Sequence, residues 1–467
     1  MFKIFAGLSH VHFVGIGGAG MSGIAEVLLS YDLQVSGCDR ARSETTDRLE
    51  SLGVEIFEGH SVDHLDGVDL VVKSSAVPDD NPEIRAARER GITVVRRAEM
   101  LGELMRLKFG IAIAGTHGKT TTTSLVGTLL TEANLDPTVI VGGRMRVLGT
   151  GARVGKSDYL VAEADEFDRS FLRLMPVLAV ITNIDRDHLD TYGSFDAIRA
   201  AFMDFATRVP FFGQLILCLD DPTVQEILPE LRESHRVVTY GLTPQADFVA
   251  SDLRRSEKGG CTFAVRGPGI EPGSEMTLPM PGKHNVANAL AAIAVGRALD
   301  LPFDQIGAAL ADFGGVHRRF ERLGTWRGAT VIDDYAHHPA EVAATLEAAR
   351  QAFPGQRIHA VFQPHLFSRT RDQAEGFGRA LLNADAVVVT AIYPSREAPI
   401  PGVSGRDVVD AARASGHRQI HYCEELRGAP DLLEVQDGDV VITLGAGDVV
   451  KLAQELAAQE TVQEGGA

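Results

Sequence analysis

Short apolar runs alternate along the chain with segments whose apolar residues recur every three or four positions. Apolar runs with the length of buried strands include residues 11–14, 68–72, 109–114 and 159–162. Strands that alternate with helices predict parallel sheets covered by helices. Residues 243–281 depart from this pattern, because Pro, Gly and short alternating stretches there predict antiparallel hairpins.

The alternation falls into three blocks, at residues 1–108, 109–315 and 316–467. A length of 467 residues is enough for about three domains. We therefore expect an α/β protein with a Rossmann-like N-terminal domain and a Rossmann-like C-terminal domain. Between them we expect a central P-loop ATPase-type parallel sheet with the antiparallel strands appended.

Composition narrows the range of partners and compartments. The net charge of -18 argues against non-specific binding to nucleic acid or to an anionic membrane. The uncharged runs are too short to span a bilayer, and the N-terminus lacks the layout of a signal peptide. The four cysteines are far apart in sequence, which argues against a disulfide framework or a zinc cluster and suits a reducing compartment: Cys38, Cys218, Cys261 and Cys423. We expect a cytoplasmic protein, either a monomer or a homodimer.

A glycine-rich loop that ends in Gly-Lys-Thr follows the apolar run at residues 109–114. Its glycines would let backbone N–H groups point at one anion, Lys119 would reach the outer phosphates, and the Thr120 hydroxyl would ligate magnesium. The strict consensus asks for glycine at position 113, where the chain has Ile113. We still favour nucleoside triphosphate binding over a plain glycine turn, with contacts from Gly115, Thr116, His117, Gly118, Lys119, Thr120 and Thr121.

A second glycine loop, Gly-x-Gly-x-x-Gly at residues 15–20, lies between an apolar strand and a helix-period segment. Asp39 follows it at the spacing of the acid that binds ribose in dinucleotide-binding domains. We expect a diphosphate ligand here, the alternative being a tight turn without a ligand. The expected contact residues, including hydroxyls at the end of the strand at 68–72, are Gly17, Gly18, Ala19, Gly20, Met21, Ser22, Asp39, Ser74 and Ser75.

Four carboxylates in six residues follow the strand at residues 159–162. Such a cluster repels itself unless a cation lies among its members, so we favour a metal site over a solvated acidic loop. Glu163 is the first candidate because it is closest to the strand. His188, beside acids at the end of another strand, is a candidate ligand for a second metal. Arg318 and Arg319 adjoin a domain boundary and could reach a phosphate.

Together these motifs resemble the Mur ligase family over almost the whole chain. The resemblance implies that the three domains bind UDP-N-acetylmuramate, then ATP with Mg2+, then an amino acid. It implies Lys119 at the ATP phosphates, Thr120, Glu163 and His188 at the magnesium ions, and Arg319 or Arg318 at the γ-phosphate. It also implies His284, Asn285 and Asn288 near adenine, Asp334 near the ribose, and His338 and Arg369 near the amino acid and the muramate carboxylate. The residues expected to take part in catalysis are then Lys119, His188, Arg319 and His338, with His338 as the candidate base.

The implied reaction activates the muramate carboxylate as an acyl phosphate, which the amine of L-alanine then attacks. Family members that add later residues carry a carbamylated lysine, and this chain has no lysine between Lys156 and Lys258, which favours alanine addition. Many relatives have arginine where this chain has Leu366, so one anionic contact is missing or is supplied elsewhere. The alternatives are a ligase that attaches a recycled tripeptide, an NAD-dependent oxidoreductase and a nucleotide-gated binding protein.

Overall fold

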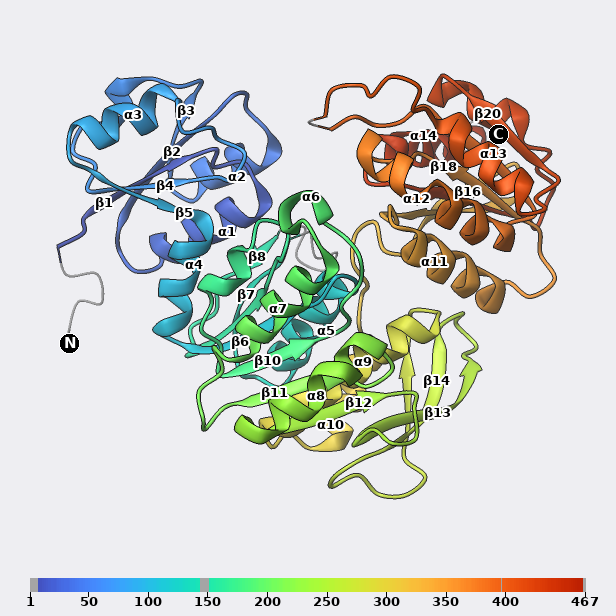
Figure 1. Ribbon diagram of the computed structural model, residues 1–467, viewed down its shortest axis with the longest axis horizontal. Coiled ribbons are helices and arrows are strands. Elements are labelled where there is room, and N and C mark those ends of the chain that lie inside the picture. Colours follow the sequence, from blue (N-terminus) through green and yellow to red (C-terminus); the bar gives the residue numbers. More distant parts are fainter. Residues whose placement is uncertain (1–6, 143–150, 396, 465–467) are drawn as a thin grey trace. The chain divides into compact units, whose positions relative to one another are not determined.

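The computed structural model describes residues 7–142, 151–395 and 397–464. Three sheets of five, ten and six strands organise these residues, and helices surround the sheets (Figure 1). The three-domain α/β fold expected from the sequence is confirmed. Among the described residues, no helix has both the length and the apolar character required to cross a membrane.

The first sheet is fully parallel and has the order β3-β2-β1-β4-β5. Its strands are β1 (His10–Val14), β2 (Gln34–Asp39), β3 (Glu55–Glu58), β4 (Leu70–Lys73) and β5 (Thr93–Arg96). The accompanying helices are α1 (Ala19–Leu29), α2 (Glu44–Ser51), η1 (Val62–Leu65), α3 (Pro82–Glu89) and α4 (Arg97–Arg106). Because side chains alternate along a strand, Val11 and Phe13 of β1 join one core and Val14 joins another. The chain reverses direction across the sheet between β1 and β4, which places the loop after β1 at the switch point where such sheets bind ligands.

The central sheet has the order β15-β14-β13-β12-β11-β10-β6-β9-β7-β8. Its parallel part comprises β6 (Phe109–Ala114), β7 (Thr138–Ile140), β9 (Tyr159–Glu163), β10 (Leu178–Ile181), β11 (Gln214–Cys218) and β12 (Val237–Gly241). The short β8 (Ala152–Arg153) pairs antiparallel with β7. The appended strands are β13 (Phe248–Arg255), β14 (Cys261–Arg266) and β15 (Glu275–Leu278). A short turn at residues 256–260 joins β13 to its neighbour β14, so these two strands form the expected antiparallel hairpin.

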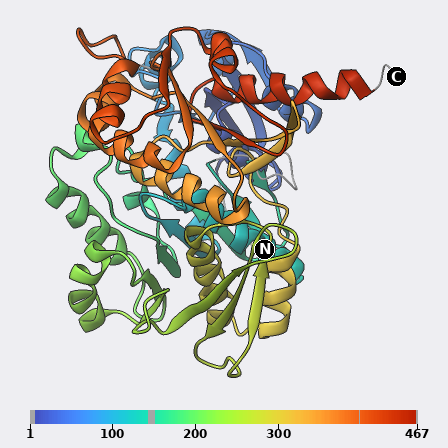
Figure 2. The same cartoon turned by 90° about the vertical axis from the view of Figure 1, so that its right-hand side faces the viewer.

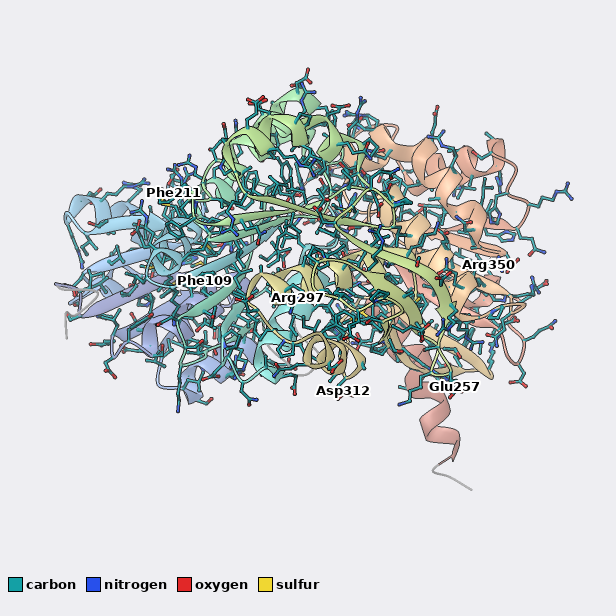
Figure 3. All side chains as sticks on the ribbon, turned by 90° about the horizontal axis from the view of Figure 1, so that it is seen from below. Phe109, Phe211, Glu257, Arg297, Asp312 and Arg350 are labelled. Atoms are coloured by element: carbon teal, nitrogen blue, oxygen red, sulfur yellow. The ribbon has the colours of Figure 1, made fainter. Side chains whose placement is uncertain are left out.

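Seven helical segments of the described chain accompany the central sheet: α5 (Lys119–Glu132), η2 (Ser170–Arg173), α6 (Leu189–Tyr192), α7 (Phe195–Ala206), α8 (Pro222–Ser234), α9 (Lys283–Ala298) and α10 (Phe303–Ala311). Arg297, labelled in Figure 3, fixes the end of α9. Its guanidinium donates to the carbonyl of Leu301 at 2.7 Å, just before α10 begins. This hydrogen bond satisfies a backbone carbonyl in the turn that follows α9.

The third sheet has the order β16-β17-β21-β18-β19-β20. Its strands are β16 (Glu321–Trp326), β17 (Ala329–Asp334), β18 (Ile358–Phe362), β19 (Ala386–Thr390), β20 (Ile420–Cys423) and β21 (Val440–Leu444). The helices are α11 (Pro339–Ala352), α12 (Phe367–Ala380), η3 (Leu381–Asn383), α13 (Gly405–Ala414), η4 (Leu426–Leu432) and α14 (Val449–Glu464), the last of which extends past the sheet in Figure 2. The antiparallel edge strand β16 departs from a purely parallel Rossmann-like sheet. Arg327 and Gly328, both with positive φ, make the two-residue turn that folds β16 back on β17.

The chain divides into two compact units. One unit contains the first sheet and most of the central sheet, at residues 7–251, 264–276 and 287–314 of the described chain. The other contains the third sheet with residues 252–263 and 277–286.

Candidate active site

The glycine loop at residues 115–118 connects the central strand β6 to the N-terminus of α5. Gly115 has φ +134° and Gly118 has φ +81°, conformations that favour glycine. Gly118 is the N-cap of α5, so it has no side chain to bond the first N–H groups of the helix. Uncapped N–H groups and the positive end of the helix dipole make such a turn a binding site for an anion.

Residues at the carboxyl end of β10 brace this loop. The Thr182 hydroxyl donates to the carbonyl of His117 at 2.6 Å. The Asn183 side chain accepts from the His117 N–H at 2.8 Å and donates to its carbonyl at 3.0 Å. The His117 ring lies 3.2 Å from the carboxylate of Asp185. Residues that follow β10 therefore fix the backbone of the loop through contacts within the protein.

Lys119, the first residue of α5, forms a buried ion pair with Glu166. Its Nζ atom lies 2.8 Å from Glu166 Oε2 and donates to the carbonyls of Gly115 at 2.7 Å and Thr116 at 3.1 Å. Burial works against the charge of Lys119, but the nearby carboxylates outweigh it and raise its pKa. Burial raises the pKa of Glu166, which is 2% exposed. The loop thus contains a charged lysine whose counterion is one buried carboxylate.

Thr120 and Glu163 form the second polar pair of the loop. The Thr120 hydroxyl donates to Glu163 at 3.0 Å, and the N–H of Gly142 donates to the same carboxylate at 2.8 Å. His188 Nε2 lies 3.8 Å from Glu166 Oε1, and its ring makes an edge contact with Phe167. A hydroxyl and two carboxylates at one edge are the oxygen donors that Mg2+ prefers, so these residues fit a magnesium site. The structure therefore brings Lys119, Thr120, Glu163 and His188 together.

The expected adenine contacts lie at and after the start of α9. Asn288 accepts a hydrogen bond from Thr122 of α5 at 3.2 Å, and its Oδ1 would lie 2.6 Å from a Cβ added at Gly118. Asn285 donates to the carbonyl of Pro281 at 2.8 Å, which is the capping role that the sequence also allowed. His284, in the same first turn, is exposed, and Thr121, in the first turn of α5, is buried.

The first glycine loop, at residues 15–20, lies between β1 and α1 as expected. The N–H of Gly17 donates to Asp39 Oδ2 at 2.9 Å, so the acid at the end of β2 bonds the loop itself. Gly18 is the N-cap of α1 and has no side chain that could accept from the first N–H groups of the helix. Gly20 lies against the side chain of Arg97. Ser74 packs against Gly15, whereas Ser75 is exposed. Met21 and Ser22, in the first turn of α1, are buried, and only the backbone of Ala19 is described.

In the third domain, Arg318 and Arg319 have different surroundings. Arg318 donates to Asp333 at 2.9 Å and to the carbonyl of Gly445 at 2.6 Å, so it ties β17 to the loop after β21. Arg319 has its guanidinium 4.0 Å from Glu341 and keeps a quarter of its side chain exposed. Of the two arginines, Arg319 is the one with the weaker contact inside its own domain.

Asp334 is the last residue of β17, His338 lies after that strand, and Arg369 lies after β18 of the same sheet. Asp334 accepts from the N–H groups of Phe320 and Ala336, both at 2.8 Å, and burial raises its pKa to about 6. His338 is the N-cap of α11, where it accepts from the N–H of Ala340. Arg369 on α12 lies 3.4 Å from His365. The polar ends of these strands therefore form one edge of the third sheet.

Three family models match the chain: "Mur ligase family, catalytic domain" at residues 10–109, "Mur ligase middle domain" at 113–296, and "Mur ligase, glutamate ligase domain" at 318–447. The UDP-N-acetylmuramate–L-alanine ligase of Sorangium cellulosum is 53% identical, with 98% of each chain covered. The chain belongs to the Mur ligase family. The enzyme of the same name from Geobacter sulfurreducens is 51% identical over 96% of each chain.

Solved structures agree with this assignment. The crystal structure of UDP-N-acetylmuramate–alanine ligase from Thermotoga maritima has a TM-score of 0.81 and 32% identity, covering 97% of this Mur ligase and 99% of that chain. A murein peptide ligase from Psychrobacter arcticus has a TM-score of 0.69 at 24% identity, covering 96% and 98%, and so shares the fold.

Sequence reasoning missed three polar residues of this Mur ligase that the structure places at the loop. Glu166 is one of four acids in the cluster, and the sequence alone does not distinguish it as the partner of Lys119. Asn183 and Asp185 hold His117. Asn183 and Asp185 follow β10, a parallel strand that pairs with β6, the strand before the glycine loop. This position at the binding edge of the sheet is the sequence signal that could have identified them.

Proposed function

We propose that this chain is an ATP-dependent ligase that joins L-alanine to the muramate carboxylate of UDP-N-acetylmuramate. One observation supports the proposal most directly. The chain is 53% identical to a UDP-N-acetylmuramate–L-alanine ligase, and in it a charged Lys119 and the acids Glu163 and Glu166 adjoin the anion-binding loop. The reaction would consume ATP and release ADP and phosphate as the amide forms. We place it in the cytoplasm, in the synthesis of peptidoglycan precursors.

The glycine loop of the central domain would bind the ATP phosphates. The N–H groups at the start of α5 would point at them, and Lys119 would offset the charge that builds on the transferred phosphoryl group. Asn285, Asn288 and His284 would adjoin the adenine, and Asp334 the ribose. Arg319 is the better choice for the γ-phosphate because Arg318 is committed to Asp333.

Thr120, Glu163 and His188 would hold Mg2+, with Glu166 beside them. When bound, the ion supplies positive charge that stabilises the phosphoryl oxygens during transfer. The loop at residues 15–20, Asp39 and Ser74 would bind the UDP part of the sugar nucleotide, near the uncapped end of α1.

The muramate carboxylate would attack the γ-phosphorus of ATP, which gives an acyl phosphate and ADP. The amine of L-alanine would attack the acyl carbon, and phosphate would leave from the tetrahedral intermediate. His338 and Arg369 would lie near the amino acid and the carboxylate, with His338 as the group that takes the proton of the amine. Exclusion of water would protect the acyl phosphate from hydrolysis.

Phosphate release tests the proposal directly. The purified protein would be given ATP, Mg2+ and UDP-N-acetylmuramate, and then L-alanine, glycine, L-serine or the murein tripeptide in turn. We expect release only when sugar nucleotide and amino acid are both present, with L-alanine effective and a product one alanine heavier by mass spectrometry. Activity with the tripeptide alone would replace the proposal with the recycling ligase, and no turnover with any acceptor would favour a nucleotide-gated binding protein.

A further inference from the structure

A second cluster of chemically reactive side chains lies in the first domain. It consists of His12 on β1, Cys38 on β2, His64 in η1 and Glu83 in the first turn of α3. One nitrogen, sulfur or oxygen atom from each of these residues lies within 4.8 Å of the others. In the register of β1 and β2, His12 pairs with Ser36 and Val14 with Cys38, so His12 and Cys38 lie on the same face of the sheet.

Glu83 is a carboxylate without solvent exposure, next to an apolar core that includes Ile84 and Ala87. Such a group must be paired, because an isolated buried charge is costly. The Cys38 thiol donates to Oε2 at 2.9 Å, and the His64 ring lies 2.5 Å from Oε1. Burial raises the pKa of Glu83, but its contacts with His12, Cys38 and His64 outweigh burial and lower it to about 2. The cluster therefore contains a fully buried carboxylate surrounded by imidazole and thiol groups.

His12 points an unused nitrogen into this cluster. His12 is fully buried, and its Nε2 has no hydrogen-bond partner among the described residues. That atom lies 3.7 Å from Glu83 Oε1, beyond hydrogen-bond distance. The other ring nitrogen, Nδ1, lies 2.8 Å from the Ser36 hydroxyl. A histidine held at one nitrogen with the other left over is typical of a metal ligand.

We propose that His12, Cys38, His64 and Glu83 bind one Zn2+ ion. Two imidazoles, a thiolate and a carboxylate form a donor set typical of zinc and differ from the oxygen donors at the ATP loop. Tetrahedral zinc holds such donors about 3.3–3.8 Å apart, so the present separations need only small adjustments. Because the ligand is the thiolate, binding would release the Cys38 proton to solvent.

Neighbouring side chains would orient the ligands. His60 Nδ1 lies 3.3 Å from Cys38 Sγ and 3.0 Å from Glu83 Oε2. Phe57 stacks on the His64 ring with centroids 4.1 Å apart and planes 11° apart. These contacts limit the freedom of three of the four ligands, which lowers the entropic cost of binding an ion. The ion would join β1, β2, η1 and α3 of the first domain.

Cobalt tests the cysteine ligand specifically, because a Co2+–thiolate bond gives a charge-transfer absorption in the near ultraviolet. The full chain would be reduced, freed of metal with a chelator and titrated with Co2+. We expect a band that saturates at one equivalent and disappears when Zn2+ is added. Cys38→Ser should abolish the band, and it should fold because serine can still donate to Glu83. Cys218→Ser, at another buried cysteine, should leave the band unchanged.

A band that is absent from the wild-type protein, or that persists in Cys38→Ser, would overturn the proposal and leave the cluster a hydrogen-bonded network. The histidine ligand has its own test. His64→Gln should weaken Zn2+ binding by at least about tenfold in competition with a chelator. Unchanged Zn2+ affinity in this variant would remove His64 from the site. Zn2+ should also raise the melting temperature of the wild-type protein but not that of Cys38→Ser.

Discussion

The buried pair of Lys119 and Glu166 allows the stability of the central domain to be separated from its catalysis. Lys119→Met removes the charge and keeps most of the length of the side chain. At the observed 2.8 Å the gross attraction between the two charges is about 6 kcal/mol at an effective dielectric constant of 20. Part of this is offset by desolvation, and loss of one partner of a buried pair costs about 3–5 kcal/mol.

Protonation of Glu166 sets an upper limit on that loss. A carboxyl with an ordinary pKa of 4.5 can be protonated at a cost of about 1.4 kcal/mol per pH unit, which is about 5 kcal/mol near pH 8 and about 1.4 kcal/mol near pH 5.5. Burial already raises the pKa of Glu166 in the folded protein, and removal of Lys119 raises it further. A raised folded pKa means that stability is lost as pH rises. The Lys119→Met protein should therefore be least stable at alkaline pH.

Urea unfolding at both pH values measures this effect. We expect Lys119→Met to lose about 3–5 kcal/mol near pH 8 and about 1 kcal/mol near pH 5.5. Lys119→Met/Glu166→Gln should recover to within about 1 kcal/mol of wild type at both, yet stay at least about 100-fold less active in phosphate release. Lys258→Met, at an exposed lysine, is the control. Equal losses at the two pH values, or no recovery in the double variant, would refute the electrostatic reasoning.

Three further predictions concern single residues. Gly115→Ala should lower the free energy of unfolding, measured in urea, by about 3 kcal/mol. Gly115 has φ +134°, and the new Cβ would lie 1.9 Å from Thr182 Oγ1. The control is Gly193→Ala, at a glycine with positive φ and open space around it, which should cost only about 1 kcal/mol. Burial raises the pKa of Asp334 from 3.8 to about 6, so ionisation of this carboxyl opposes folding. Between about pH 4 and pH 7 the wild-type protein should therefore lose about 2–3 kcal/mol of unfolding free energy relative to the Asp334→Asn variant. Glu163→Gln should raise the Mg2+ concentration needed for half-maximal phosphate release by about tenfold or more, measured by Mg2+ titration at saturating ATP.

The strands and the two glycine loops could be predicted because both depend on local sequence. An apolar run identifies a strand wherever it lies, and the turns after β1 and β6 need glycine for backbone reasons that involve few other residues. Gly115 and Gly118 both have positive φ, as the turn requires. The antiparallel strand β16 was harder to identify, since its apolar residues alternate only weakly and the Arg327-Gly328 turn resembles many others.

The partners inside the site could not be predicted, because they depend on where the chain turns after a strand. Glu163, Glu166 and Asp168 are close in sequence and chemically alike. Distance from the strand favoured Glu163, yet the fold buries Glu166 against Lys119 and leaves Asp168 exposed. Similarly, nothing local distinguishes Arg318 from Arg319. Only the approach of β17 and the loop after β21 commits Arg318 to Asp333 and to the carbonyl of Gly445.

Cys38 illustrates the same limit for clusters of side chains from separate elements. The wide spacing of the cysteines argued against a zinc cluster, because sequence reasoning looks for cysteines a few residues apart. The first sheet instead gathers one cysteine with two histidines and an acid drawn from four separate elements. Parallel pairing of β1 with β2 places His12 and Cys38 on the same face of the sheet, and the first turn of α3 brings Glu83 close to both. Long-range pairing of this kind is set by topology and leaves no local motif.

The hydrogen bonds of Lys119 connect the fold of the loop to its chemistry. Lys119 donates to Glu166 and to the carbonyls of Gly115 and Thr116, so protein acceptors hold its ammonium group at the turn. In the proposed complex with ATP, phosphate oxygens would replace acceptors that Lys119 already has, so the lysine would gain little from binding ground-state ATP. As negative charge develops on the transferred phosphoryl group, Lys119 would bind the phosphoryl oxygens more strongly than its protein acceptors. Interactions that strengthen only in the transition state raise the rate of the chemical step. We therefore expect Glu166 to contribute to catalysis by limiting how tightly Lys119 binds the ground state.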